Sequence, residues 1–169
     1  MFDNDYLLTG KHAKFTRFMK EDARIFETNV DIYLNGAIFG LLYNKHAKKD
    51  TGTDKTNILA SAFINRQSEC KFLYRLVMLL QQVTNETPEE KIERAFRDDA
   101  DPEQADRLKE NLEIFNSYVR GGIEVLYDQF VEGNSTNDDY FEEAFDQIEA
   151  FYKHNKRANF EEEIVDLIG

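Results

Sequence analysis

The chain has 169 residues, of which 41% are hydrophobic and 32% are charged, and its formal net charge is −12. This length and apolar content suit one domain with a hydrophobic core of its own. The only cysteine, Cys70, excludes an intramolecular disulfide and a cysteine-based zinc cluster. The longest apolar run, AIFGLLY, is far shorter than the roughly 20 residues that a membrane helix needs. The first residues also lack a signal-peptide pattern, so we expect a cytoplasmic protein.

Helical periodicity recurs along the chain, and we therefore predict an all-α fold. We expect a single domain over residues 1–169, built as a bundle of five to seven helices. A short helix is predicted at about residues 10–20, and a longer one follows at about residues 21–46. Asp54 is a candidate N-cap for a helix at about residues 55–84. The second half of that helix is apolar nearly all round, which favours a central place in the bundle.

In the second half of the chain, a capping residue followed by proline occurs at two places, and each predicts the start of a helix. Thr87 and Pro88 open a helix that ends near Asp98. A second signal of the same kind predicts a long helix at about residues 102–132. Asn137 or Asp138 opens the next helix, whose apolar residues include Phe141, Phe145, Ile148 and Tyr152. A short apolar helix is predicted at about residues 160–168.

Four glycines lie within the predicted helices and are candidates for a close contact between helices. Gly121 and Gly122 are adjacent in the long helix, and Gly36 and Gly40 are one turn apart in an earlier one. A glycine inside a helix costs about 1 kcal/mol relative to alanine. This cost is tolerable where another backbone approaches closely. We predict that the two glycine sites face each other or face a second subunit; the alternative is a kink that splits the long helix.

Charge is distributed unevenly between the two halves of the chain. Residues 1–84 carry a net charge of +3, and residues 85–169 carry −15. The acidic half is either a solvated surface or a site for a basic partner. The basic residues of the first half could contact nucleic-acid phosphates, or they could form a solvated face balanced by the acidic half. These residues are Lys11, Lys14, Arg17, Lys20, Lys45, Lys48 and Lys49.

Sequence motifs for catalysis or metal binding are lacking. The three histidines, His12, His46 and His154, lie in polar, basic stretches without the spacing of metal ligands. Cys70 adjoins an apolar run and is interpreted as an inert thiol rather than a nucleophile. We therefore predict a protein that is not an enzyme, with no catalytic residue, no bound cofactor and no metal.

The C-terminal segment NFEEEIVDLIG has one apolar stripe, which could dock in a partner's groove or on the protein's own bundle. The stripe consists of Phe160, Ile164, Leu167 and Ile168. The favoured function is a non-catalytic interaction or assembly subunit that self-associates, in a prokaryotic or phage system. One alternative is a nucleic-acid-associated accessory factor that uses the basic N-terminal face. The other is an enzyme whose site local motifs do not reveal.

Overall fold

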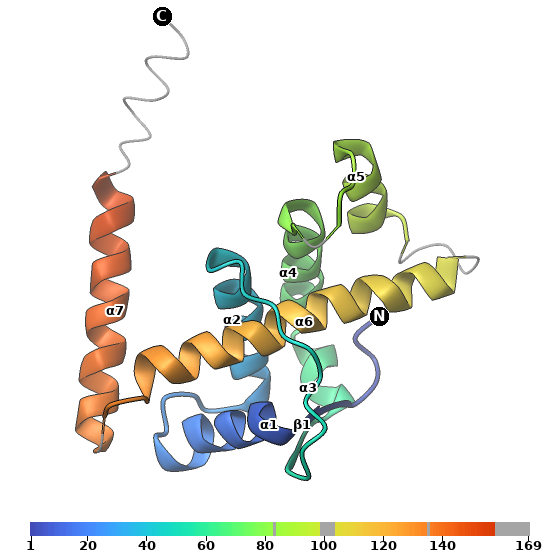
Figure 1. Cartoon of the computed structure of the whole chain (residues 1–169). Coiled ribbons are helices and arrows are strands. Elements are labelled where there is room, and N and C mark those ends of the chain that lie inside the picture. Colours follow the sequence, from blue (N-terminus) through green and yellow to red (C-terminus); the bar gives the residue numbers. More distant parts are fainter. Residues whose placement is uncertain (83, 99–103, 135, 158–169) are drawn as a thin grey trace, which may run out of the picture.

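The computed structural model describes residues 1–82, 84–98, 104–134 and 136–157. Within these ranges the chain is mostly helical, with seven α-helices and a small two-stranded sheet, and the predicted all-α bundle is confirmed (Figure 1). In chain order the elements are β1 (Tyr6–Thr9), α1 (Gly10–Arg17), the π-helical turn η1 (Phe18–Asp22), α2 (Asn29–Leu42), β2 (Lys55–Ile58), α3 (Ala60–Asn65), α4 (Gln67–Leu80), α5 (Pro88–Phe96), α6 (Ala105–Phe130) and α7 (Asn137–Arg157).

The centre of the molecule is the crossing of α2 and α6. The long helix α6 runs across the whole molecule, and α2 packs against it more extensively than any other two elements pack together (Figure 1). The prediction that the helix at 55–84 would be central is therefore wrong. Because α6 and α4 both pack against α2, its buried residues are spread around much of its circumference. They are Val30, Ile32, Tyr33, Leu34, Gly36, Ala37 and Gly40.

The predicted helix at 55–84 is replaced by a strand and two helices. Strand β2 pairs antiparallel with β1, with Tyr6 opposite Ile58. Asp54 accepts a hydrogen bond from the Arg17 side chain and does not cap a helix. A non-helical backbone at Arg66 (φ −116°, ψ 24°) separates α3 from α4. The strand was missed because it has only four residues and its partner lies about fifty positions away, which local periodicity cannot reveal.

Capping explains where two of the helices begin. The predicted helix at 21–46 starts only at Asn29, because Thr28 and Asp31 form a capping box in which each side chain binds the other's backbone N–H. Thr87 caps α5 as predicted, with Glu90 completing the box. Helix α6 falls within the predicted range 102–132, although the proline signal at its start lies outside the described residues.

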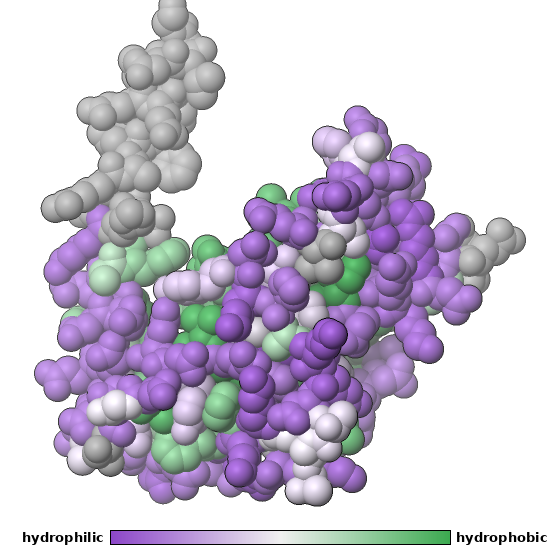
Figure 2. Space-filling model, in the orientation of Figure 1, coloured by the Kyte–Doolittle hydropathy of each residue, from purple (hydrophilic) through white to green (hydrophobic). Residues whose placement is uncertain are grey.

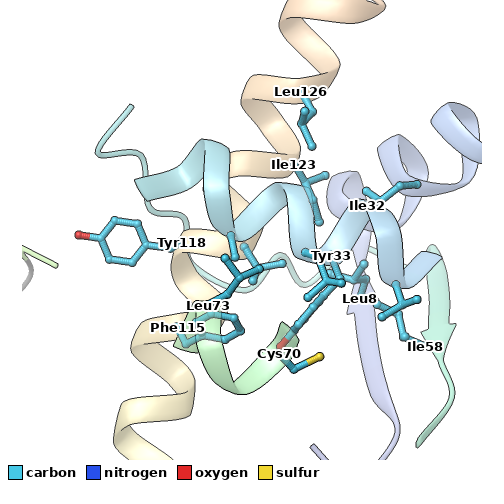
Figure 3. Close-up of a cluster of buried hydrophobic side chains, with 14 of the residues drawn as sticks. Leu8, Ile32, Tyr33, Ile58, Cys70, Leu73, Phe115, Tyr118, Ile123 and Leu126 are labelled. Atoms are coloured by element: carbon cyan, nitrogen blue, oxygen red, sulfur yellow. The ribbon is translucent and has the colours of Figure 1, made fainter. Parts of the chain in front are cut away.

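The core is rich in aromatic rings where α2, α4 and α6 meet (Figure 3). The ring of Phe115 lies 5.8 Å from that of Tyr33 and 6.0 Å from that of Tyr74, measured between centroids. Cys70 is fully buried in the same cluster, and burial raises the pKa of its thiol to about 11. The thiol is therefore protonated at neutral pH, in keeping with the role of an inert core residue.

Candidate protein-interaction surface

Helix α7 exposes a line of large apolar side chains. Phe141 is 51% exposed, Phe145 and Ile148 are each 65% exposed, and Tyr152 is 60% exposed. Their spacing of four, three and four residues places them on one face of the helix. These four residues are called the α7 stripe. Exposed apolar residues are ordinary singly, but a contiguous line of them is typical of a surface that binds a partner.

A different face of α7 attaches it to the rest of the molecule. Tyr140 is buried and its ring meets that of Phe18 edge to face, with centroids 6.0 Å apart. Ala144, one turn further along, packs partly against the core. Because successive residues of a helix are about 100° apart, this face points in a different direction from the α7 stripe. The attachment therefore leaves the stripe exposed.

An apolar groove of about 170 Å³ lies between α7, α2 and the end of α6. On the α2 side it includes Leu42 and Tyr43, which are 56% and 54% exposed. Hydrophobic surface gathers on the upper part of α7 and between α7 and the body of the molecule (Figure 2). The lining of this α2–α7 groove comprises Ile38, Phe39, Leu42, Tyr43, Gln129, Phe130, Gln147, Ile148 and Phe151. Ile148 belongs to both the groove and the stripe, so the two form one continuous surface.

The α2 side of this groove was missed by the sequence analysis. The run Leu41–Leu42–Tyr43 was assigned to a helix continuing to residue 46, whereas α2 ends at Leu42. Asn44 then has a positive φ of 45°, which turns the chain away. The only local indication that the helix ends here was Asn44 itself, because asparagine adopts this left-handed conformation more readily than most residues do.

The structure brings three of the four candidate glycines together inside the fold. A Cβ atom added at Gly122 would lie 2.5 Å from the backbone nitrogen of Gly40 and 2.6 Å from the carbonyl carbon of Gly36. A Cβ atom at Gly36 would lie 2.8 Å from the carbonyl oxygen of Val119. The contact between α2 and α6 is thus within one chain, and α6 continues through both glycines as one helix.

Gly121 has a different neighbour. A Cβ atom there would lie 2.8 Å from the Cα of His46, in the segment that follows α2. The guanidinium group of Arg120, which is 2% exposed, fixes the same segment by donating a 2.9 Å hydrogen bond to the carbonyl of Ala47. Gly121 therefore lets a loop, rather than a helix, approach the backbone of α6.

Within the described part of the chain, carboxylates engage three of the seven residues in the basic cluster. The Nζ of Lys11 and that of Lys45 lie 2.9 Å and 4.0 Å from different carboxylate oxygens of Glu124. Arg17 pairs with Asp54 at 2.7 Å. The cluster as a whole occupies α1 (Lys11, Lys14, Arg17), η1 (Lys20) and the segment between α2 and β2 (Lys45, Lys48, Lys49). Folding therefore reduces the positive field that this face could offer to phosphates.

His12 is buried beside the same Glu124 carboxylate. Its Nε2 lies 2.9 Å from Glu124 Oε1, and its Nδ1 is buried without a hydrogen-bond partner among the described residues. Burial lowers the pKa of His12, and the hydrogen bond and charge of Glu124 oppose this only in part. The nearby cations Lys11 and Arg120 lower it further. The folded protein therefore favours the neutral ring.

The free energy of unfolding should consequently decrease as the pH falls below about 6.5, the usual histidine pKa in an unfolded chain. Below that pH the unfolded state takes up a proton that folded His12 accepts only at lower pH, so acid favours unfolding. His12→Gln keeps a donor for Glu124 and removes the titrating group. Denaturant unfolding between neutral pH and about pH 5.5 should show a smaller decrease for the variant than for the wild type. An equal decrease in the two proteins would contradict this assignment.

Comparison of the chain with protein-family models, curated proteins and solved structures finds no match. In the described ranges no group of three or more His, Cys, Asp or Glu residues could hold a metal ion. Nor does any helix there have the length and apolar character to cross a membrane. The predicted C-terminal docking residues Phe160, Ile164, Leu167 and Ile168 lie outside the described residues.

Proposed function

We propose that this protein is a non-catalytic interaction or assembly subunit that self-associates through the surface formed by the α7 stripe and the α2–α7 groove. The observation that supports the proposal is the exposure of Phe141, Phe145 and Ile148 in one line along a helix. Fully burying a side chain of this size is worth about 1.5–3 kcal/mol, so covering several together gives a substantial driving force for association. The charged residues around the stripe resemble the polar rim of a protein interface.

Nucleic-acid binding through the basic N-terminal face is the less favoured alternative. Its weakness is that Glu124 and Asp54 already engage Lys11, Lys45 and Arg17. An enzymatic function is also less favoured, because His12 pairs with Glu124 and the buried Asp98 accepts a hydrogen bond from Asn111, and none of these groups lines the α2–α7 groove. Retention of the protein on DNA or RNA with a steep dependence on salt would favour the first of these alternatives.

Replacing Phe145 with glutamate should convert the protein into a monomer. The substitution places a charge in the middle of the α7 stripe, and burying an unpaired carboxylate in an apolar interface is strongly unfavourable. Light scattering after size exclusion should give the wild type at least twice the subunit mass of 19.8 kDa. The Phe145→Glu variant should elute at the subunit mass with unchanged helical content.

Phe72→Glu is a matched control, since Phe72 is equally exposed, at 63%, but lies on α4 away from this surface. The control should keep the mass of the wild type. A wild-type protein that remains at the subunit mass over the whole concentration range would refute self-association.

A further inference from the structure

We propose that the α7 stripe binds the α7 stripe of a second copy of this chain, with the two helices antiparallel. In this arrangement Phe145 packs against the partner's Ile148, and Phe141 packs against the partner's Tyr152. The inference rests on the self-association proposed above, and it adds which helix forms the contact and how the two copies are oriented.

The spacing of the stripe is the first reason. Steps of four, three and four residues form a seven-residue repeat, in which apolar side chains of two helices can interlock along a shared seam. From Phe141 to Tyr152 the stripe spans 11 residue steps, or about 16 Å. Helix α7 forms one edge of the described molecule, so a second helix can approach along its length (Figure 1).

The distribution of charge along α7 is the second reason, and it determines the orientation. All six carboxylates of the helix precede Ala150, and all of its lysines and arginines follow Phe151. The carboxylates are Asp138, Asp139, Glu142, Glu143, Asp146 and Glu149, and the cations are Lys153, Lys156 and Arg157. A parallel pair would place the acidic halves side by side, and like charges repel. An antiparallel pair with the contacts above places Asp138 and Asp139 near the basic end of the partner, and it avoids setting all six carboxylates beside their equivalents.

The same distribution favours a second copy over an unrelated partner. A two-fold interface uses one surface twice, so that surface must be complementary to itself. An apolar stripe with an acidic start and a basic end meets this requirement when it is turned through 180°. A uniformly basic partner would match only the first half of α7, and a uniformly acidic partner only the second.

Disulfide trapping tests both the contact and its orientation. Phe141→Cys and Tyr152→Cys are made separately in the full chain, one of them with a tag that separates the two by mass. The native Cys70 is fully buried and provides little background. After oxidation of a mixture, we expect a covalent dimer that joins the two variants. Each variant alone should stay largely uncrosslinked, because residues at the same position are far apart in an antiparallel pair.

Three outcomes would overturn the inference in distinguishable ways. Dimers that form within each single variant but not between the two would indicate parallel helices. If no crosslink forms and the Phe145→Glu variant keeps the oligomeric mass of the wild type, the chain self-associates through a different surface. A wild-type monomer would remove self-association as well. Should either cysteine variant lose helical content, Glu142→Cys and Lys153→Cys joined by a short bifunctional reagent provide the same comparison at polar positions.

Discussion

Replacing Gly122 with alanine should lower the free energy of unfolding by about 2 kcal/mol, although alanine is the better helix former. The gain in helix propensity is at most about 1 kcal/mol. The added methyl group, however, would overlap the backbone of α2 at both Gly36 and Gly40. Overpacking a tight contact costs about 1–3 kcal/mol, and backbone atoms cannot rotate away as a side chain can. We therefore place the cost near the upper end of that range.

The effect should grow steeply with the size of the side chain. Gly122→Leu should prevent α2 from docking on α6, and we expect little folded protein. Gly40→Ala should resemble Gly122→Ala, since its Cβ would lie 2.7 Å from the carbonyl carbon of Tyr118. For a chain of this length a loss of 2 kcal/mol corresponds to a decrease in Tm of about 4–8 °C.

Thermal unfolding of the variants provides the measurement, with Asp128→Ala as the control. Asp128 is exposed on the same helix, and replacing it should change the stability by no more than about 0.5 kcal/mol. A higher Tm for Gly122→Ala, together with a well-folded Gly122→Leu variant, would mean that no backbone lies close to this glycine.

Arg94→Met should destabilise the protein by about 3 kcal/mol, because it removes the cation from a buried polar network. Arg94 is 8% exposed and its guanidinium group donates hydrogen bonds to Glu86 and to Asn111. Asn111, which is fully buried on α6, donates in turn to Asp98 at 2.7 Å. The network therefore ties α5 and its flanking segments to α6. Methionine fills similar space but removes the guanidinium donor from Asn111 and from Glu86, which keeps only its neutral donors Thr84 and Gln81.

Arg97→Met is the matched control, at the C-cap of the same helix. Arg97 forms a surface pair with Glu93 at 2.6 Å and its side chain is 72% exposed, so its loss should cost no more than about 0.5 kcal/mol. Urea unfolding of both variants at neutral pH measures the difference. Equal stabilities would show that the network contributes nothing beyond an ordinary surface ion pair.

The same network adds a dependence on pH. Burial raises the pKa of Glu86, but hydrogen bonds from Thr84 and Arg94 outweigh this effect and lower it overall. A lowered carboxyl pKa in the folded state stabilises the protein above the unfolded value and loses that contribution as the pH falls below it. The destabilisation caused by Arg94→Met should accordingly be larger at neutral pH than in acid.

Where structure depends on neighbours in the sequence, several predictions are confirmed. Thr87 and Pro88 start α5 because a hydroxyl acceptor and a preset φ satisfy the first turn of a helix without help from elsewhere. The helical pattern from Asn137 and the polar loop before it likewise gave α7 close to its observed start. The capping box at Thr28 and Asp31 is also a local sequence pattern. It indicates the observed start of α2 at Asn29, whereas periodicity alone placed the start too early.

Where structure depends on distant partners, the sequence was insufficient. Helix and strand patterns are hard to distinguish over four residues, so β2 became visible only through its pairing with β1. His12 lies in a stretch that the sequence pattern indicated to be polar and basic, and Arg120 is a charged residue, yet both are buried, because Glu124, Tyr6 and Ala47 supply partners from remote segments. Burial of a polar group follows from such partners and not from its own hydropathy.

The sequence by itself determined the helical class of this protein, several helix starts, the uneven charge and the small-residue positions on α2 and α6. These features depend on backbone preferences and on composition, which act within a few residues. The tertiary structure alone decided that Gly122 meets Gly36 and Gly40 within one chain. It likewise decided which apolar residues of α7 face outward, since Tyr140 and Ala144 attach the helix and leave Phe145 exposed. Periodicity specifies that a helix has an apolar face, but only the packing of neighbouring elements determines which part of that face is covered.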